Sequence, residues 1–164
     1  FFSNKVKVIN LKLEHMYGLY DDKNKFVPWL VQSLINNVDH IDLTKGEQKR
    51  DFINVNDVVN VYTLLLEKYK NLPSYSEFDV GTGEQIQLKD FILKVYQEIK
   101  KRQNINTKLN FGALNYREGE PMVVNEDLKP LYSLGWQPTI TVEQGINDIL
   151  TNEYFNKNKI LSKQ

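Results

Sequence analysis

The sequence contains no cysteine and only two histidines among its 164 residues. Without thiols, a disulfide framework and thiolate catalysis are excluded. A structural zinc site usually needs four Cys or His ligands, so we expect no metal site. No apolar run approaches the roughly 18 residues that a membrane span needs, so we also expect no membrane-spanning segment.

The sequence has no excess of charge of either sign, because 21 Lys and Arg residues balance 21 Asp and Glu residues. Binding to nucleic acid or to an anionic membrane surface needs a positive field, so neither is expected as the main partner. The chain is 41% apolar and 26% charged, which is ordinary for a globular protein. We therefore expect a cytoplasmic protein made of one domain or a large part of one.

The sequence begins with Phe1 rather than Met, and the apolar stretch 6–13 follows almost at once. A buried strand so near the start leads us to expect that upstream chain is missing. The alternative is a trimmed or renumbered form of a complete small protein.

Short β-branched runs alternate with helical stripes along the chain, which predicts an α/β fold with some parallel strand pairing. Asn56 or Asp57 is expected to cap the second helix, and Thr141 with Gln144 forms a capping box for the last one. The predicted strands are 6–13, 41–43, 50–55, 77–80 and 108–111, and the predicted helices are 27–35, 58–69, 88–99 and a short one at 126–132.

Two arginines are the strongest candidates for ligand binding. Arg50 lies at a junction between a loop and a strand, and Arg117 lies in a loop containing Gly and Pro. The planar guanidinium group suits a diphosphate because it donates two charge-assisted hydrogen bonds. Charge pattern alone favours surface ion pairs instead. The expected partners would then be Asp51 or Glu47 for Arg50, and Glu118 or Glu120 for Arg117.

Two further features have both a structural and a functional interpretation. Gly81-Thr-Gly83 follows a strand and precedes a helix, but it lacks the three glycines of a dinucleotide fingerprint, so we interpret it as a connecting turn. His15 and Tyr17 follow the first strand, and ligands bind at the carboxyl ends of strands in open α/β sheets. A hydrogen-bonded loop histidine and a packing tyrosine are equally consistent with these residues.

Several motifs occur in a characteristic order and cover nearly the whole chain, from residue 6 to residue 149. Together they resemble the extended short-chain dehydrogenases/reductases of the NAD-dependent epimerase/dehydratase family, which act on nucleotide sugars. The motifs are His15-Met-Tyr-Gly18, Lys25-Phe-Val-Pro28, Gly46-Glu-Gln-Lys-Arg-Asp-Phe-Ile-Asn-Val-Asn-Asp57, Phe78-Asp-Val-Gly-Thr-Gly83, Arg117-Glu-Gly-Glu120, Leu134-Gly-Trp-Gln-Pro138 and Val142-Glu-Gln-Gly-Ile146.

The resemblance implies the C-terminal part of a Rossmann-type, NAD(P)-binding fold: the last strands of the sheet plus a small α/β substrate-binding subdomain. It implies that Arg50 and Arg117 bind the diphosphate and that Glu120 lies near the ribose. The remaining implied contacts are His15, Tyr17, Lys25 and Phe26 with the substrate, Leu43 with the base, and the backbone of Leu13 with the nicotinamide.

Two residues depart from the family pattern, since Lys12 replaces an arginine and His15 replaces an asparagine. The form around His15 is most similar to the branch that includes CDP-abequose-type 4-reductases of 6-deoxy sugars. The glycine-rich cofactor turn and the catalytic Tyr-x-x-x-Lys pair of the family are not found here. Tyr96 and Lys100 have the right spacing but lie on a predicted amphipathic helix, with Tyr96 in the core. We therefore expect no catalytic residue here, and NAD or NADP bound mainly by a missing N-terminal part.

The resemblance implies that the parent protein is an enzyme, a homodimer that reduces or epimerises a nucleotide-linked hexose at C4. A non-catalytic module that binds nucleotide sugars, or an α/β interaction domain without a small ligand, are the alternatives. The expected segments are 1–20 (late strand and loop of the cofactor domain), 21–57 (substrate binding), 58–100 (return to the cofactor-domain sheet) and 101–164 (C-terminal substrate binding and last helix). Strands 6–13 and 77–80 should share the cofactor-domain sheet, strands 41–43 and 50–52 should form an accessory sheet, and the open side of the main sheet should expose apolar surface.

Overall fold

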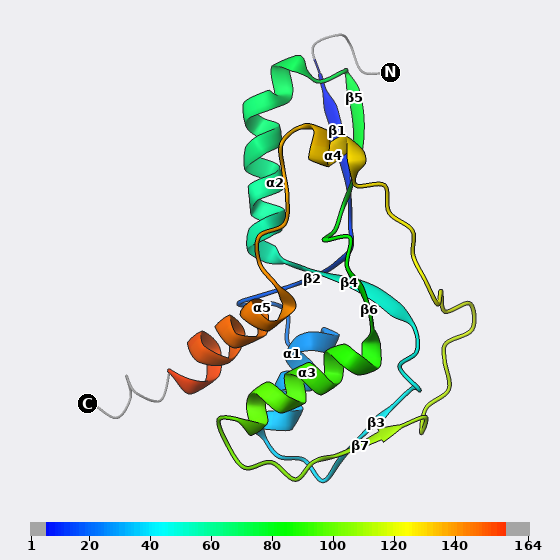
Figure 1. Ribbon diagram of the computed structural model, residues 1–164, viewed down its shortest axis with the longest axis vertical. Helices are drawn as coiled ribbons and strands as arrows, with labels where there is room; N and C mark the ends of the chain where they lie inside the picture. The colour runs from blue at the N-terminus through cyan, green and yellow to red at the C-terminus, as the bar shows by residue number, and fades with distance from the viewer. Residues whose placement is uncertain (1–5, 157–164) are drawn as a thin grey trace.

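The computed structural model describes residues 6–156, in which strands and helices alternate as the sequence predicts (Figure 1). The fold is mixed α/β. The strands are β1 (Val8–Leu13), β2 (His15–Tyr17), β3 (His40–Leu43), β4 (Lys49–Asn54), β5 (Tyr75–Val80), β6 (Gln85–Gln87) and β7 (Lys108–Phe111). The helices are α1 (Phe26–Ile35), α2 (Val55–Lys68), α3 (Leu88–Lys100), α4 (Lys129–Ser133) and α5 (Val142–Ile149), with a 3₁₀ turn η1 (Tyr69–Asn71) after α2 and a π-helical turn η2 (Leu150–Phe155) after α5.

Parallel pairing dominates the sheets, as expected. β1 pairs with β5 in parallel register from Val8↔Tyr75 to Leu13↔Val80, which confirms that these two strands share one sheet. α2 connects β4 to β5 and packs against this pair (Figure 1). The carboxyl ends of β1 and β5 therefore point the same way, toward β2, β4 and the cavity described below.

The predicted accessory sheet of residues 41–43 and 50–52 is wrong. β3 pairs in parallel with β7, from His40↔Lys108 to Leu43↔Phe111, and not with β4. β4 instead lies between β2, with which it is parallel, and β6, with which it is antiparallel. Strand β6 is too short and too polar to have been predicted from its sequence.

The helices begin close to the predicted positions, with two corrections at their N-termini. Asn54, rather than Asn56 or Asp57, caps α2 by accepting a hydrogen bond from the backbone N–H of Asn56 at 2.9 Å. The capping box of α5 is confirmed, with Thr141 and Gln144 each bonding the other's backbone N–H. The short helix α4 begins at Lys129, three residues later than predicted, with Pro130 in its first turn where the missing N–H costs nothing.

Two hydrophobic clusters lie on opposite faces of strand β4 (Figure 1). The larger is formed by the inner faces of α1, α3 and α5, with Phe52 and Phe91 stacked at 3.8 Å between ring centroids. The smaller lies between α2, the β1–β5 pair and Trp136. Alternation along β4 sends Phe52 into the first cluster and Ile53 into the second, so this strand joins the two halves.

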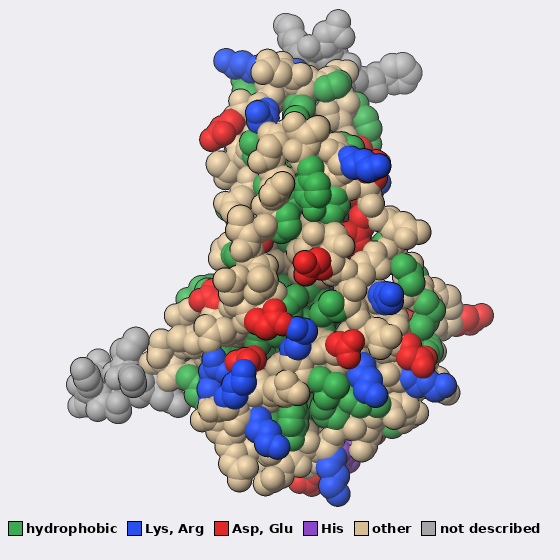
Figure 2. Space-filling view, in the orientation of Figure 1, with side chains coloured by type: hydrophobic (Ala, Val, Ile, Leu, Met, Phe, Trp, Pro, Cys, Tyr) green, Lys and Arg blue, Asp and Glu red, His purple; other side chains and the backbone are tan. Residues whose placement is uncertain are grey.

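The surface carries both charges, and Figure 2 shows Lys and Arg side chains interspersed with Asp and Glu over the lower half of the molecule. Apolar side chains are exposed on α2, at Val59, Tyr62 and Leu66, and Leu13 at the end of β1 is 37% exposed. β1 has a strand partner on one side only within residues 6–156. No helix in this part of the chain is both long and apolar enough to cross a membrane.

Candidate functional site

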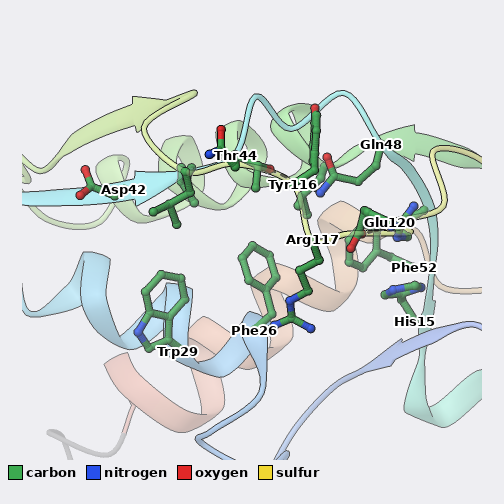
Figure 3. Close-up of a pocket in the computed structure, with 15 residues that line it drawn as sticks. His15, Phe26, Trp29, Asp42, Thr44, Gln48, Phe52, Tyr116, Arg117 and Glu120 are labelled. Carbon is green, nitrogen blue, oxygen red and sulfur yellow. Dashed lines mark hydrogen bonds and ion pairs between the residues drawn. The ribbon is translucent and has the colours of Figure 1, made fainter.

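A cavity of about 430 Å³ opens between α1, the ends of β2 and β3, strand β4 and the loop that follows β7 (Figure 3). Segments from four distant parts of the sequence contribute side chains to it. The lining residues are His15, Phe26, Trp29, Asp42, Leu43, Thr44, Gln48, Arg50, Phe52, Leu88, Leu114, Asn115, Tyr116, Arg117 and Glu120. The cavity thus contains six of the nine residues that the resemblance assigned to ligands.

The alternation of β4 determines which of its residues face the cavity. Gln48, Arg50 and Phe52 are two residues apart, so their side chains lie on one face of the strand and line the cavity. Asp51 and Ile53 point to the opposite face. β2 runs beside β4 with His15 opposite Phe52, and their rings meet edge to face at 5.8 Å.

Arg50 is held by an internal ion pair at one end of the cavity. Its side chain is only 7% exposed, and its Nη2 is paired with Glu120. Its Nη1 donates to the carbonyl oxygens of Lys49 at 2.7 Å and of Pro121 at 2.8 Å. The ion-pair partners expected from charge pattern, Asp51 and Glu47, are therefore wrong for Arg50.

Arg117 enters the same cavity from the loop after β7 and is exposed (Figure 3). Within residues 6–156 no carboxylate lies at ion-pair distance from its guanidinium group, so the ion pairs considered for Arg117 are not formed there. The structure thus brings together Arg50 and Arg117, which are far apart in sequence, and leaves the second one free to meet a ligand.

The wall of the cavity that α1 forms is aromatic, with Phe26 beside Arg117 and Trp29 farther from the arginines (Figure 3). Phe26 and Trp29 project from successive turns of α1, with ring centroids 6.0 Å apart, and Trp29 is 42% exposed. Leu43 at the end of β3 contributes apolar surface. The Tyr116 hydroxyl accepts from the backbone N–H of Glu47 at 3.1 Å, which holds the loop after β7 beside this wall.

Trp29, Gln48 and Tyr116 line the cavity but were not predicted. Each could have been found by its spacing from a predicted residue, because Trp29 is one helical turn after Phe26 and Gln48 is two strand positions before Arg50. Tyr116 directly precedes Arg117. Gln48 is 5% exposed, and its amide nitrogen is 3.5 Å from the Thr44 hydroxyl.

His15 is a neutral imidazole at this site near neutral pH. Burial lowers its pKa below the usual value, and the positive charge of Arg50 lowers it further, while Asp51 and Glu120 act in the opposite direction. A neutral imidazole has one donor and one acceptor nitrogen. His15 can therefore hydrogen-bond a ligand hydroxyl without adding a positive charge to the cavity.

Three predicted residues lie outside the main cavity. Tyr17 is 1% exposed in the larger core, with its hydroxyl 3.4 Å from the carbonyl oxygen of Val142, so its position does not support the predicted contact with substrate. Lys25 lines a smaller neighbouring cavity of about 140 Å³ and pairs with Asp21 at 2.8 Å. Leu13 is at the carboxyl end of β1.

Tyr96 and Lys100 do not form a catalytic pair in this arrangement. Tyr96 packs against the larger core, and the Lys100 ammonium group lies 5.9 Å from its ring centroid on the outer side of α3. Among residues 6–156 there is no group of three or more His, Asp or Glu side chains that could hold a metal ion. The chemistry available in the cavity is hydrogen bonding, cationic attraction and aromatic packing.

Comparison with known proteins gives consistent results. Residues 3–81 match the NAD dependent epimerase/dehydratase family. The chain is 39% identical to CDP-abequose synthase of Salmonella typhimurium over 145 residues, which is 88% of this chain and 48% of that protein. It is 26% identical to dTDP-4-dehydro-6-deoxyglucose reductase of Escherichia coli, over 88% of this chain and 44% of that protein.

Solved structures show the same fold. The chain superposes with a TM-score of 0.71 on UDP-glucose 4-epimerase from Thermotoga maritima in complex with UDP-glucose, at 24% identity over 92% of this chain and 46% of that one. It also superposes with a TM-score of 0.71 on RMD from Pseudomonas aeruginosa complexed with NADPH, at 16% identity over 88% of this chain and 47% of that one. The chain spans about half the length of the relatives that it matches.

Proposed function

We propose, on the premise that this chain belongs to the NAD-dependent epimerase/dehydratase family, that the full-length protein is an NAD(P)-dependent reductase or epimerase acting at C4 of a nucleotide-linked 6-deoxy hexose. In this proposal the chain supplies the half that binds the nucleotide sugar. The observation that carries it is the meeting of Arg50 and Arg117 in one cavity that also has an aromatic wall.

The two ends of the cavity suit the two ends of a nucleoside diphosphate. The arginine end suits the diphosphate because guanidinium groups donate charge-assisted hydrogen bonds to phosphate oxygens. Trp29 and Leu43, which also line the cavity, suit a nucleobase, which is flat and apolar on its faces, and Phe26 lies between Trp29 and Arg117 (Figure 3). A volume of about 430 Å³ lies in the range of ligand sites of this size.

The base end of the cavity includes Asp42 and Thr44, both of which can hydrogen-bond the edge of a base. His15 lies at the arginine end, and the smaller cavity with Lys25 begins beside it. We assign the hexose to this side, because the larger cavity already accounts for the nucleotide. Its apolar lining by Met16, Val27 and Phe52 suits a sugar carrying a methyl group at C5.

The proposed cofactor is NAD or NADP, whose nicotinamide ring exchanges a hydride with C4 of the hexose. Of the residues in this chain, Leu13 is the one assigned to it. Leu13 ends a parallel strand whose second edge carries no strand partner within residues 6–156, so backbone groups there can bond a carboxamide. The proposal assigns no proton-transfer residue to this chain. We further propose that the full-length protein is a cytoplasmic homodimer, as its resemblance to the family implies.

The test is a titration of CDP-, dTDP-, UDP- and GDP-hexoses against the full-length protein and its Arg50→Ala and Arg117→Ala variants. We expect Arg117→Ala to weaken binding of the preferred ligand by about 10- to 100-fold, the value of a charge-assisted bond, with little change in stability. Arg50→Ala should weaken binding and also destabilise the fold, because Glu120 and the Pro121 carbonyl lose their partner.

Arg102→Ala is the matched control, since Arg102 is the third arginine of the sequence and bonds Glu98 and Asn147 away from the cavity. Unchanged affinity in both cavity variants would refute the clamp assignment. Turnover with NAD(P)H and a 4-keto sugar separates the enzyme from a binding module. Tight binding of the nucleotide sugar without turnover would favour the module.

A further inference from the structure

A buried carboxylate lies directly behind Arg50, on the other face of β4. Asp51 is 1% exposed and points toward the turn between β5 and β6. The Thr82 hydroxyl and the Gly83 N–H each donate to it at 2.6 Å. The Gly-Thr-Gly turn, interpreted from the sequence as a connecting turn, therefore binds a carboxyl group of the chain itself.

A second carboxyl group reaches the same point from the loop between Glu120 and α4. A side-chain Cβ at Gly81 would lie 2.6 Å from Oε2 of Glu126 and 2.7 Å from Oδ2 of Asp51, so the two carboxyl groups occupy the space that glycine leaves. The two carboxyl groups therefore lie beside each other, and Gln85 donates to the other oxygen of Glu126 at 3.4 Å. Two carboxyl groups this close are stable when they share one proton.

The surroundings favour retention of that proton. Burial, followed by the contact with Asp51 and the charge of Glu14, raises the pKa of Glu126 to about 8. The charged groups around the cluster belong to several elements. Burial, Asp51 and Asp79 on β5 raise the pKa of Glu14, while Arg50 on β4 lowers it. Burial, Asp51, Glu126 and Glu84 raise the pKa of Tyr132 on α4. Acidic groups predominate among them.

The loop that carries Glu126 is attached to three successive residues of β4. Lys49 donates its backbone N–H to the carbonyl oxygen of Met122 at 2.8 Å. Arg50 bonds Glu120 and the carbonyl oxygen of Pro121. The carboxyl group of Asp51 lies beside that of Glu126 in the space next to Gly81. Only the third of these attachments depends on a proton. The carboxyl groups of Asp51 and Glu126 attract each other when they share a proton and repel each other when both are ionised.

We propose that a proton shared by Asp51 and Glu126 positions the loop 120–126 against β4 and so holds Glu120 and Pro121 on Arg50. Glu126 and Asp51 are then positioning residues for the clamp, acting through Arg50 rather than touching the ligand. Loss of the proton detaches the loop and releases Arg50 from two of its partners. The effect on ligand binding rests on the proposed function, whereas the attachment of the loop does not.

The test uses the full-length protein and its Glu126→Gln variant, whose neutral amide imitates the protonated carboxyl group. Glu118→Gln, an exposed residue on the same loop, is the matched control. Hydrogen exchange of loop 120–126, corrected for intrinsic rates, is measured without ligand at about pH 6.5 and about pH 9.5, on either side of the transition. We expect exchange in the wild type and in Glu118→Gln to rise at least about tenfold at the higher pH, and Glu126→Gln to change little.

Equal pH dependence in the wild type and Glu126→Gln would overturn the proposal. If the variant does not fold, a ¹³C NMR titration of the wild-type carboxyl groups decides the matter. The proposal then requires a carboxyl group that titrates above about pH 7 together with the change in exchange, and fails without it. Binding of the nucleotide sugar is measured separately at both pH values. Absence of binding at either pH would count against the proposed function and leave the result on the loop intact.

Discussion

Replacement of Asp57 by alanine should cost more stability than any other single change to a charged side chain on α2. Asp57 is fully buried in the first turn of this helix. Its carboxylate accepts hydrogen bonds from the Thr139 N–H at 3.1 Å, the Thr139 hydroxyl at 2.8 Å and the Ile140 N–H at 3.0 Å. These bonds join the smaller core to the segment that leads into α5.

The magnitude follows from what the substitution leaves behind. Two backbone N–H groups and one hydroxyl lose a charged acceptor. A buried group left without a partner costs about 1–3 kcal/mol, and the two donors of Thr139 cost less because that residue is exposed. Water that enters the vacated space recovers part of this, so we expect a total loss of about 3–5 kcal/mol, as for other broken buried polar networks. In a chain of this size that corresponds to a fall in Tm of roughly 10 °C.

Thermal and chemical denaturation of the full-length protein would measure the effect, with Asp90→Ala as the matched control. Asp90 is also an acidic residue in the first turn of a helix, α3, but it is exposed. Its loss should cost no more than about 1 kcal/mol, the value of a favourable interaction with the helix dipole. An equal, small effect in both variants would refute the reasoning, because it would show that the bonds of Asp57 contribute nothing beyond helix electrostatics.

Two further changes test other contacts of the fold. Because the unfolded chain releases the proton of Glu126 near its ordinary pKa of 4.5 and the folded chain does so at about 8, stability should fall as pH rises through that window, by about 1–2 kcal/mol after allowance for solvent screening. Denaturation at several pH values should show this slope in the wild type and a flatter profile in Glu126→Gln. Gly145→Ala on α5 should destabilise the protein by about 1–3 kcal/mol, because the new methyl group would overlap the hydroxyl of the buried Tyr17. Urea unfolding measures this change, and an unchanged free energy of unfolding would show that the reasoning is wrong.

The sequence predicted most strands and helices because their patterns are local. The stripe from Leu88 to Ile99 has one buried face with the helical period, and α3 spans Leu88–Lys100. The short segment Lys108-Leu-Asn-Phe111 was predicted as a strand with the bounds that β7 has. That β1 and β5 belong to one sheet could be predicted from the motifs in which the two strands occur.

Pairing between distant strands could not be predicted in the same way. Residues 41–43 and 50–52 were expected to pair. In the structure β4 lies between β2 and β6, whereas β3 pairs with β7. Tyr17 illustrates a similar limit, because its position in the motif gave no information on how deeply it is buried. His15 and Tyr17 lie on the same face of β2, and both rings meet Phe52, but Tyr17 is covered by the segment at Val142 whereas His15 borders the cavity.

The Arg-Glu-Gly-Glu motif shows which part of a site a local pattern can encode. The Glu120 N–H donates to the Arg117 carbonyl at 3.0 Å, and Gly119 has a φ of +73°, so the motif is a tight turn that fixes the two charged side chains relative to each other. Arg117 is thereby directed into the cavity. Glu120 pairs with Arg50, which is 70 positions away in sequence. The local motif could not predict this pair, because it depends on the path of the whole loop after β7.

This arrangement makes the two arginines unequal, although the motifs alone suggested a symmetrical clamp. Arg50 is buried and its charge is balanced by Glu120, so it contributes little net potential to an approaching anion. Arg117 is exposed and free of such a partner within residues 6–156, so it should provide most of the attraction. A diphosphate that reaches Arg50 must compete with Glu120, and Glu120 lies on the same turn as Arg117. A ligand that binds Arg117 therefore also affects Glu120, three residues later on the same turn. Because Glu120 pairs with Arg50, the turn couples the two arginines.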